Sequence, residues 1–369
     1  MKEGIKRGRL GTAVSAVREP VFALIVALII VAVLITLMGY DPLNAYKVLF
    51  TSSITSAYGW GETLAMATVL LLSGLAYAVA DRCGLINLGA SGQIYMGGIA
   101  GMLFATNCEG LPKPIHIALV LIAGALAGAL YGCVAALLKN AFGASEVVTT
   151  MMLNYIAMHF CTYLISGSMK DPAGDLAQSR AALESATLPT LLSGTRLHAG
   201  VLVAIAAVVF YGFLFSRTTL GYQMRVVGMN RGAGKYAGLN IKRNQLYAMV
   251  IAGCMAGVCG AIQAIVMDQR MTIEWVGNLG FDGLAVAFLG GQNAVGMGIA
   301  SVFFGLLLSS ANKMQMLAQV PSSVVYLFQG IVIMLIIGRG IFHIKRRRRK
   351  KPARVKMAEK TATAAGKEG

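Results

Sequence analysis

Apolar stretches separated by short polar intervals run along almost the whole chain. They lie near residues 21–39, 63–80, 86–105, 115–138, 147–166, 199–215, 248–267, 283–291, 296–311 and 324–338. A helix needs about 20 apolar residues, each rising 1.5 Å, to cross roughly 30 Å of hydrocarbon. The pattern therefore predicts an all-α, polytopic membrane protein with about ten transmembrane or partial-span helices.

No polar interval between these stretches is long enough to fold separately. We therefore expect one transmembrane domain at residues 20–340, preceded by a basic segment, 1–19, and followed by a basic tail, 341–369. The first apolar stretch exceeds the ~7–15 residue core of a signal peptide, so we interpret it as the first span.

Composition agrees with a membrane protein, because 57% of the 369 residues are hydrophobic, 13% are charged, and the mean hydropathy is +0.69. The 44 glycines predict close helix packing. Gly124, Gly128 and Gly132 recur at every fourth position, as do Gly253 and Gly257. We expect these two ridges to be packing faces.

The net charge of +17 is unevenly distributed. Residues 1–19, 216–247 and 339–369 hold 23 of the 32 lysines and arginines. The positive-inside rule predicts that all three segments are cytoplasmic, so both termini lie inside a cell membrane. The run KRRRRKK, Lys345–Lys351, is expected to contact anionic membrane lipid and not nucleic acid.

Acidic residues gather in the presumed outer loops. These residues are Asp41, Glu62, Glu109, Asp171, Asp175, Glu184, Asp268, Glu274 and Asp282. Because charges within the spans are then nearly absent, an ion-coupled carrier lacks its usual coupling groups. The pattern favours energy supplied by a separate partner ATPase.

The stretch at 283–311 is interrupted by GGQN, Gly290–Asn293. Two cytoplasmic termini require an even number of crossings, and the first arm is too short to span alone. We therefore expect two short arms that form a hairpin or a pair of abbreviated helices.

Glycine-rich breaks at 84–93, GLINLGASGQ, and at 289–296 lie next to apolar runs. Irregular backbone at membrane depth is tolerated where it is buried in protein or lines a cavity. These breaks are candidates for a solute pathway, and ordinary interfacial turns remain the alternative. The candidate pathway residues are Asn87, Ser91, Gln93, Asn154 and Asn293. Asn154 is expected near mid-membrane, either as a tie between helices or as a ligand contact.

The loop at 216–247 carries six bases and no acid. Its apolar residues Met224, Val226, Val227 and Met229 are compatible with a short amphipathic helix that docks another protein, and a plain lipid-facing loop is the alternative. The GAGKY run does not fit a phosphate-binding loop, because Met229 and Tyr236 occupy positions that require Gly and Ser or Thr. Cysteines and histidines are scattered without ligand spacing, so no metal site or cofactor is predicted.

Four ordered blocks carry a family resemblance: GLINLGASGQIYMGG (84–98), SEVVTTMMLNYIA (145–157), VVGMNRGAGKYAGLNI (226–241) and GFDGLAVAFLGGQNAVG (280–296). They resemble permease subunits of ABC importers for nucleosides and simple sugars, which are related to ribose and branched-chain amino acid permeases. Ser91 and Ala294 depart from the family's usual Glu and Pro.

The resemblance implies a type II importer permease that is a transporter subunit and not an enzyme. It further implies partner ATPase subunits, a second permease subunit that is identical or homologous, and an extracytoplasmic solute-binding lipoprotein. Residues 225–238 would form a coupling helix. The residues implied in coupling are Arg225, Gly228, Asn230, Arg231, Lys235 and Tyr236.

Two alternatives remain at this stage. One is an ion-coupled carrier or channel. The other is a rhomboid-like intramembrane serine protease, because GASG at 89–92 is similar to a rhomboid G-x-S-G and would make Ser91 the nucleophile with His159 as base.

Overall fold

The computed structural model describes residues 22–350, and in that range the chain is helical without a β-sheet. The predicted segment 1–19 and the tail beyond Lys350 lie outside the described residues. The helices are Phe22–Leu37, α2 (Pro42–Ile54), α3 (Ala57–Arg82), α4 (Ala90–Asn107), α5 (Lys113–Phe142), α6 (Glu146–Ser166), α7 (Gly200–Arg217), α8 (Thr219–Met229), α9 (Arg231–Tyr236), α10 (Ile241–Ile262), η1 (Gln263–Met267), α11 (Leu279–Leu289), α12 (Ala294–Ala318) and α13 (Ser323–Lys350).

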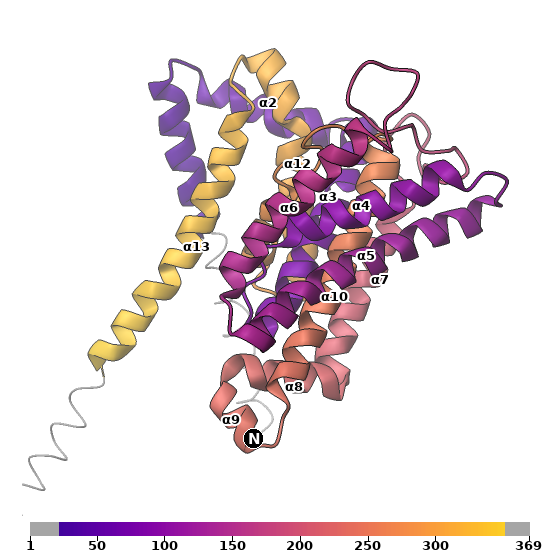
Figure 1. Ribbon diagram of the computed structural model, residues 1–369. Coiled ribbons are helices and arrows are strands. Elements are labelled where there is room, and N and C mark those ends of the chain that lie inside the picture. The colour runs from indigo at the N-terminus through magenta and orange to yellow at the C-terminus, as the bar shows by residue number, and fades with distance from the viewer. Residues whose placement is uncertain (1–21, 351–369) are drawn as a thin grey trace, which may run out of the picture.

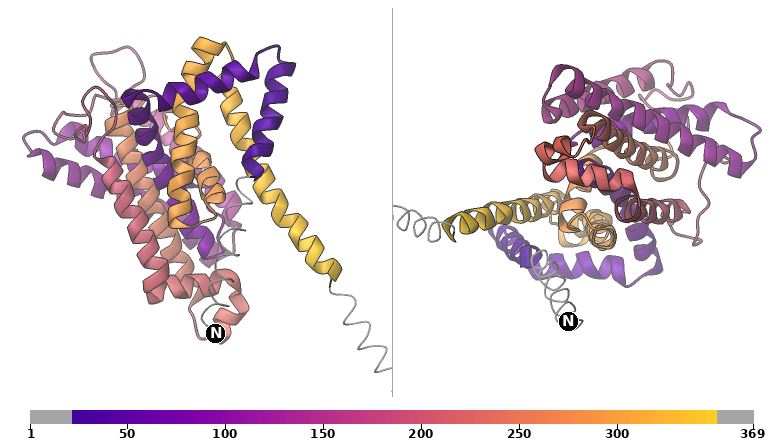
Figure 2. Two further views of the ribbon diagram at one scale, coloured as in Figure 1. Left: turned by 180° about the vertical axis from the view of Figure 1, so that it is seen from behind. Right: turned by 90° about the horizontal axis from the view of Figure 1, so that it is seen from below.

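Six of the described helices are long and apolar enough to cross a membrane: α3, α5, α6, α7, α10 continued by η1, and α12. Phe22–Leu37, α4, α11 and α13 complete the bundle, which confirms the predicted all-α architecture. Helices α8 and α9 lie at one end, the lower end of Figure 1, which we call the α8 end. Helix α2 crosses the opposite end (Figure 2) and was not predicted.

The backbones of α5 and α10 are in close contact. A Cβ atom added to Gly257 would lie 2.1 Å from the Gly124 carbonyl oxygen, and one added to Gly253 would lie 2.2 Å from that of Gly128. Only glycine fits at such separations, so the two predicted glycine ridges are confirmed as packing faces.

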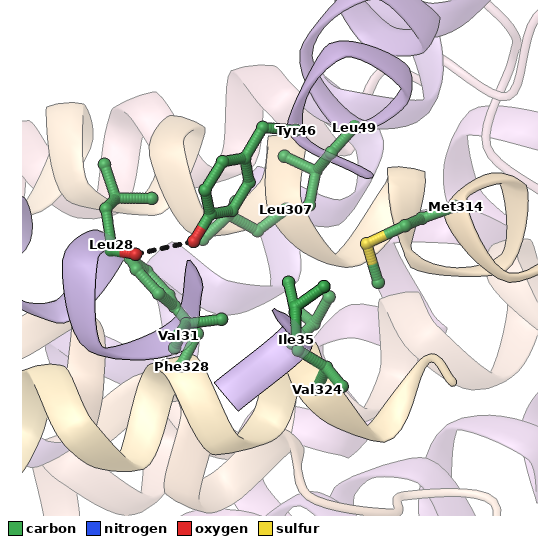
Figure 3. Close-up of a pocket in the computed structure, with 10 residues that line it drawn as sticks. Leu28, Val31, Ile35, Tyr46, Leu49, Leu307, Met314, Val324 and Phe328 are labelled. Atoms are coloured by element: carbon green, nitrogen blue, oxygen red, sulfur yellow. Dashed lines mark hydrogen bonds between the residues drawn. The ribbon is translucent and has the colours of Figure 1, made fainter. Parts of the chain in front are cut away.

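A second packing region joins the Phe22–Leu37 helix to α2, α12 and α13 (Figure 3). Tyr46 donates its hydroxyl hydrogen bond to the Leu28 carbonyl oxygen at 2.7 Å. The cavity beside this bond measures about 20 Å³ and has an apolar lining that includes Ile35, Met314 and Phe328. An apolar void of this size has no groups to hold a water molecule, so we regard it as a packing gap and not a site.

The interrupted stretch near residue 290 forms one short and one full-length helix. Helix α11 has 11 residues, as the prediction of a short first arm requires, but α12 has 25 residues, so the prediction of a short second arm was wrong. Residues 268–278, which precede α11, are neither helix nor strand, and together with the short α11 they form the first arm.

Contacts at both ends show where this irregular segment runs. Ser179, in the segment between α6 and α7, donates its backbone N–H to the Met271 carbonyl oxygen at 2.9 Å. Ser73 on α3 donates to the Leu279 carbonyl oxygen at 2.9 Å. Ser73 lies nine residues, or about 13 Å of helix, before the end of α3 at the α8 end. Helix α11 therefore begins near mid-depth and runs to the α8 end.

Asp282 was expected in an outer loop, and this expectation was wrong. It lies in the first turn of α11 and is 8% exposed. The polar residues of the irregular segment precede it directly, so the hydropathy pattern grouped Asp282 with a loop although the chain had already entered the bundle.

Candidate functional site

A cavity of about 310 Å³ opens near mid-depth where α4, α6 and the beginning of α11 meet. Its lining includes Ser91 and Tyr95 from α4, Asn154 and Tyr155 from α6, and Asn278 and Phe281 at the start of α11. Asn154 lies eight residues beyond the first residue of α6, which is about 12 Å along the helix. The cavity thus lies beside the irregular segment 268–278, where α4 and α11 both begin inside the bundle.

Asn154 ties α6 to the beginning of α4. Its side-chain N–H donates to the Leu88 carbonyl oxygen at 2.8 Å, and its side-chain oxygen accepts from the Gly92 N–H at 2.8 Å. Helix α4 has no side-chain cap of its own, so Asn154 supplies the acceptor from a neighbouring helix. Of the two roles left open for Asn154, the geometry supports the tie between helices.

Asn87 and Gln93 pair with each other behind the cavity. They are 1% and 2% exposed, their side chains lie 3.2 Å apart as donor and acceptor, and Asn87 also accepts from the Gly89 N–H at 3.1 Å. Neither lines the cavity. Ser91 does line it, is 7% exposed, and has a hydroxyl without a hydrogen-bond partner among residues 22–350.

The two glycine-rich breaks include turns at the α8 end. Gly84 has φ +72°, and a Cβ added there would lie 3.1 Å from the Cα of Gly228 on α8. Asn293 is the N-cap residue of α12 and does not line the cavity. The chain from Gly84 to Gly89 then leads from this end into the bundle, where α4 begins beside the cavity.

The expected single coupling helix at 225–238 is in fact two helices, which corrects that prediction. Asn230 separates α8 from α9 with φ −158°, and its side chain caps α9 by accepting from the Ala233 N–H at 3.1 Å. Met224 and Val227 are 0% exposed, whereas Met229 and Tyr236 are 82% and 97% exposed. The pair thus has one buried apolar face and one outward face.

The outward face also carries charge. Arg231 and Lys235 are exposed, and Arg225 is partly buried. Arg231 donates to the Gly84 carbonyl oxygen at 3.2 Å, and a Cβ added to Gly228 would lie 2.3 Å from the Arg82 carbonyl oxygen. Helices α8 and α9 are therefore in direct contact with the chain that leads to α4.

A polar cluster that the sequence did not reveal joins α3, α7 and the turn after α11. The Gln292 carbonyl oxygen accepts from Arg82 at 2.7 Å and from the Tyr211 hydroxyl at 2.8 Å. The Gln292 side chain donates to Asp81. We call Asp81, Arg82, Tyr211 and Gln292 the clasp. The adjacent Asp81 and Arg82 at the end of a span were the only sequence signal for it.

The protease alternative requires contact between a serine and a histidine. No described residue, His159 included, hydrogen-bonds the Ser91 hydroxyl, and the His159 side chain is exposed on α6. The nucleophile and base of a serine hydrolase stand within about 3 Å of each other. This arrangement does not support proteolysis.

Comparison with known proteins agrees with the geometry. The sequence profile of a family described as "Branched-chain amino acid transport system / permease component" matches residues 60–337. The guanosine ABC transporter permease protein NupP of Bacillus subtilis is 36% identical over 321 residues, 86% of this chain and 92% of that protein. The nucleoside ABC transporter permease protein NupB of Lactococcus lactis is 33% identical, with coverage of 88% and 92%. A glucose ABC transporter permease protein of Haloferax volcanii is 31% identical, with coverage of 88% and 87%.

Proposed function

This chain belongs to the family of permease components of branched-chain amino acid transport systems, and from its similarity to guanosine, nucleoside and glucose permeases we propose that it carries a nucleoside or a simple sugar into the cell. It is an ABC importer permease, a multi-pass membrane protein that leaves ATP hydrolysis to separate ATPases. The observation that best supports the transport role is the cavity at the start of α11. Broken helices with a polar cavity near mid-depth are typical of solute sites in transporters.

The proposed orientation places the α8 end in the cytoplasm together with both termini. The bases of α8 and α9 favour this side by the positive-inside rule. An ATPase then docks on the outward face, where Met229 and Tyr236 offer apolar contacts beside Arg231 and Lys235. A solute-binding lipoprotein docks at the opposite end, and a second permease subunit covers the open side of the cavity.

Two contact routes support alternating access driven from the α8 end. Movement of α8 and α9 acts on Gly84 and so on the beginning of α4, which carries Ser91. The clasp holds the far end of α11, whose other end carries Phe281. Both walls of the cavity are therefore connected to the ATPase side, as rigid-body switching requires.

The proposal is tested by reversing charge on the outward face. In a reconstituted importer, the double variant Arg231→Glu/Lys235→Glu is expected to lose more than about tenfold of ATP-dependent uptake. An ATPase surface that is complementary to two bases is acidic, and it would repel the two new acids and oppose assembly. Stimulation of ATP hydrolysis by the loaded binding protein is measured in parallel and is expected to fall with uptake. Lys113→Glu, an exposed lysine at the opposite end, is the matched control for assembly with the ATPase, which is measured by co-purification. Normal uptake and stimulation in the double variant would refute the docking face.

One observation favours an ion-coupled carrier as a second candidate. Asp282 is a buried acid within the bundle, and such acids commonly serve ion coupling. Disabling the partner ATPase separates the two functions, because an ATP-driven importer then stops while an ion-coupled carrier continues.

A further inference from the structure

Three aromatic side chains line the cavity, and one of them, Tyr95 on α4, packs edge-on against Trp275. Tyr155 on α6 is 53% exposed and Phe281 on α11 is 42% exposed. Neither ring makes an aromatic contact with another described ring, so their faces are not used in packing against each other or against a third ring. A cavity with two unused ring faces is suited to a flat solute.

Unused polar groups lie in the same cavity. Ser91 is 7% exposed, and its hydroxyl has no hydrogen-bond partner among the described residues. The side-chain amide of Asn278 has none either, and Asn278 does not cap α11 with it. Asn154, by contrast, has both side-chain polar atoms engaged. Ser91 and Asn278 are therefore two groups of the lining that are free to hydrogen-bond a solute.

The charges around the cavity further restrict the class of solute that it can bind. Helices α4 and α11 both begin there, but Asn154 supplies an acceptor to the first turn of α4 and Asp282 lies in the first turn of α11, so neither helix end adds a free positive charge. The cavity lining contains no Lys or Arg, and Glu274 is its only charged residue. A lining without Lys or Arg offers no salt bridge to an anion. The cavity therefore suits a solute without a negative charge.

We propose that Tyr155 and Phe281 stack on the base of a nucleoside while Ser91 and Asn278 hydrogen-bond its polar edge. The ring pair thereby selects solutes that carry a flat heterocycle over plain hexoses. The inference rests on the proposed transport function and names the residues that set its specificity. Base stacking on aromatic side chains tolerates different bases, so one cavity can serve purine and pyrimidine nucleosides.

The test uses the complete importer in proteoliposomes with saturating binding protein, and it compares uptake of guanosine, uridine and glucose. Tyr155→Leu and Phe281→Leu keep an apolar side chain but remove the ring. Each is expected to lower maximal nucleoside uptake about tenfold, with the half-saturating concentration unchanged because the binding protein sets it. Tyr155→Phe retains the ring and is expected to keep most of the activity. Tyr163→Leu, on the same helix, 73% exposed and outside the cavity lining, is the matched control.

A second measurement is made without the binding protein. Radiolabelled guanosine is bound to the permease–ATPase complex alone, and the double variant Tyr155→Leu/Phe281→Leu is expected to lose this binding. Wild-type guanosine uptake in both leucine variants would overturn the stacking proposal and leave the transport function intact. Equal loss in Tyr155→Phe would overturn it as well, because the ring would then not be the relevant feature. A wild-type importer that carries glucose but no nucleoside refutes the inference, and one that carries neither refutes the proposed function itself.

Discussion

His198 shows how a single side chain can be held in one protonation state by its surroundings. It is 0% exposed, precedes α7, and accepts from the Gly200 N–H at Nδ1 over 3.1 Å. Its Nε2 atom has no partner among the described residues. Burial lowers the pKa of His198 from 6.5 to about 4, because the charged imidazolium would be poorly solvated there.

Stability should therefore fall as the solution becomes acidic. The unfolded chain takes up a proton below pH 6.5 and the folded protein does not until about pH 4, so the contribution of His198 is complete above pH 6.5 and is lost toward pH 4. The loss is on the order of 1 kcal/mol by pH 5.5. Thermal unfolding in detergent at pH 7.5 and 5.5 measures it. His198→Asn, which keeps an acceptor for the Gly200 N–H, should show a smaller difference in stability between the two pH values than wild type. His159→Asn is the control and should show the same difference as wild type. An unchanged pH effect in His198→Asn would assign the effect to other groups.

Helix packing was the part of the fold that the sequence predicted best. Glycines at every fourth position predicted a packing face on each of two apolar helices, and the structure shows that these two faces meet in the α5–α10 contact. The span pattern gave the order of the helices. The pattern could not predict residues 268–278, because a polar segment that crosses half a bundle looks the same as an exposed loop until its tertiary contacts are known. For the same reason it missed that Asp282 is buried and that Asn278 and Phe281 line the cavity.

The α5–α10 contact predicts a large effect of one methyl group. Gly257→Ala would place a Cβ 2.1 Å from the Gly124 carbonyl oxygen, so the helices must separate. We expect a loss of about 1–3 kcal/mol or more, seen as a lower thermal midpoint and less monodisperse protein in size-exclusion chromatography. Gly298→Ala on α12 has no atom within 4 Å of the added Cβ and is the control. Equal behaviour of the two variants would contradict the close contact.

At the scale of the whole molecule, the α8 end and the cavity are about 12 Å apart along α6, yet they are connected through few contacts. The role of the basic segment 216–247 in docking stays a prediction, and of the predicted pathway residues Ser91 and Asn154 line the cavity. The sequence could not predict the clasp, because the four residues come from three separate parts of the chain and their hydrogen bonds exist only after the helices assemble.

The clasp should matter for coupling more than for ATP hydrolysis. Tyr211→Phe removes the hydroxyl that donates to the Gln292 carbonyl oxygen at 2.8 Å, while the ring remains. We expect ATP hydrolysis within about twofold of wild type and several-fold fewer solute molecules carried per ATP, because the turn after α11 is then held less firmly. Simultaneous measurement of phosphate release and uptake tests this, with Tyr163→Phe as control. A proportional change in both rates would show that the clasp serves stability alone.

The acceptor at the centre of the clasp is a main-chain carbonyl, which every amino acid possesses. Replacing the side chain at position 292 therefore leaves available two of the three hydrogen bonds that Gln292 makes to the other clasp residues, provided that the new residue tolerates the φ of +56° found there. Related proteins can therefore carry different residues at position 292 and still accept the same two hydrogen bonds at its carbonyl oxygen. Statistical searches for residues that change together across homologues would then overlook this attachment, and it would be found only by comparing structures.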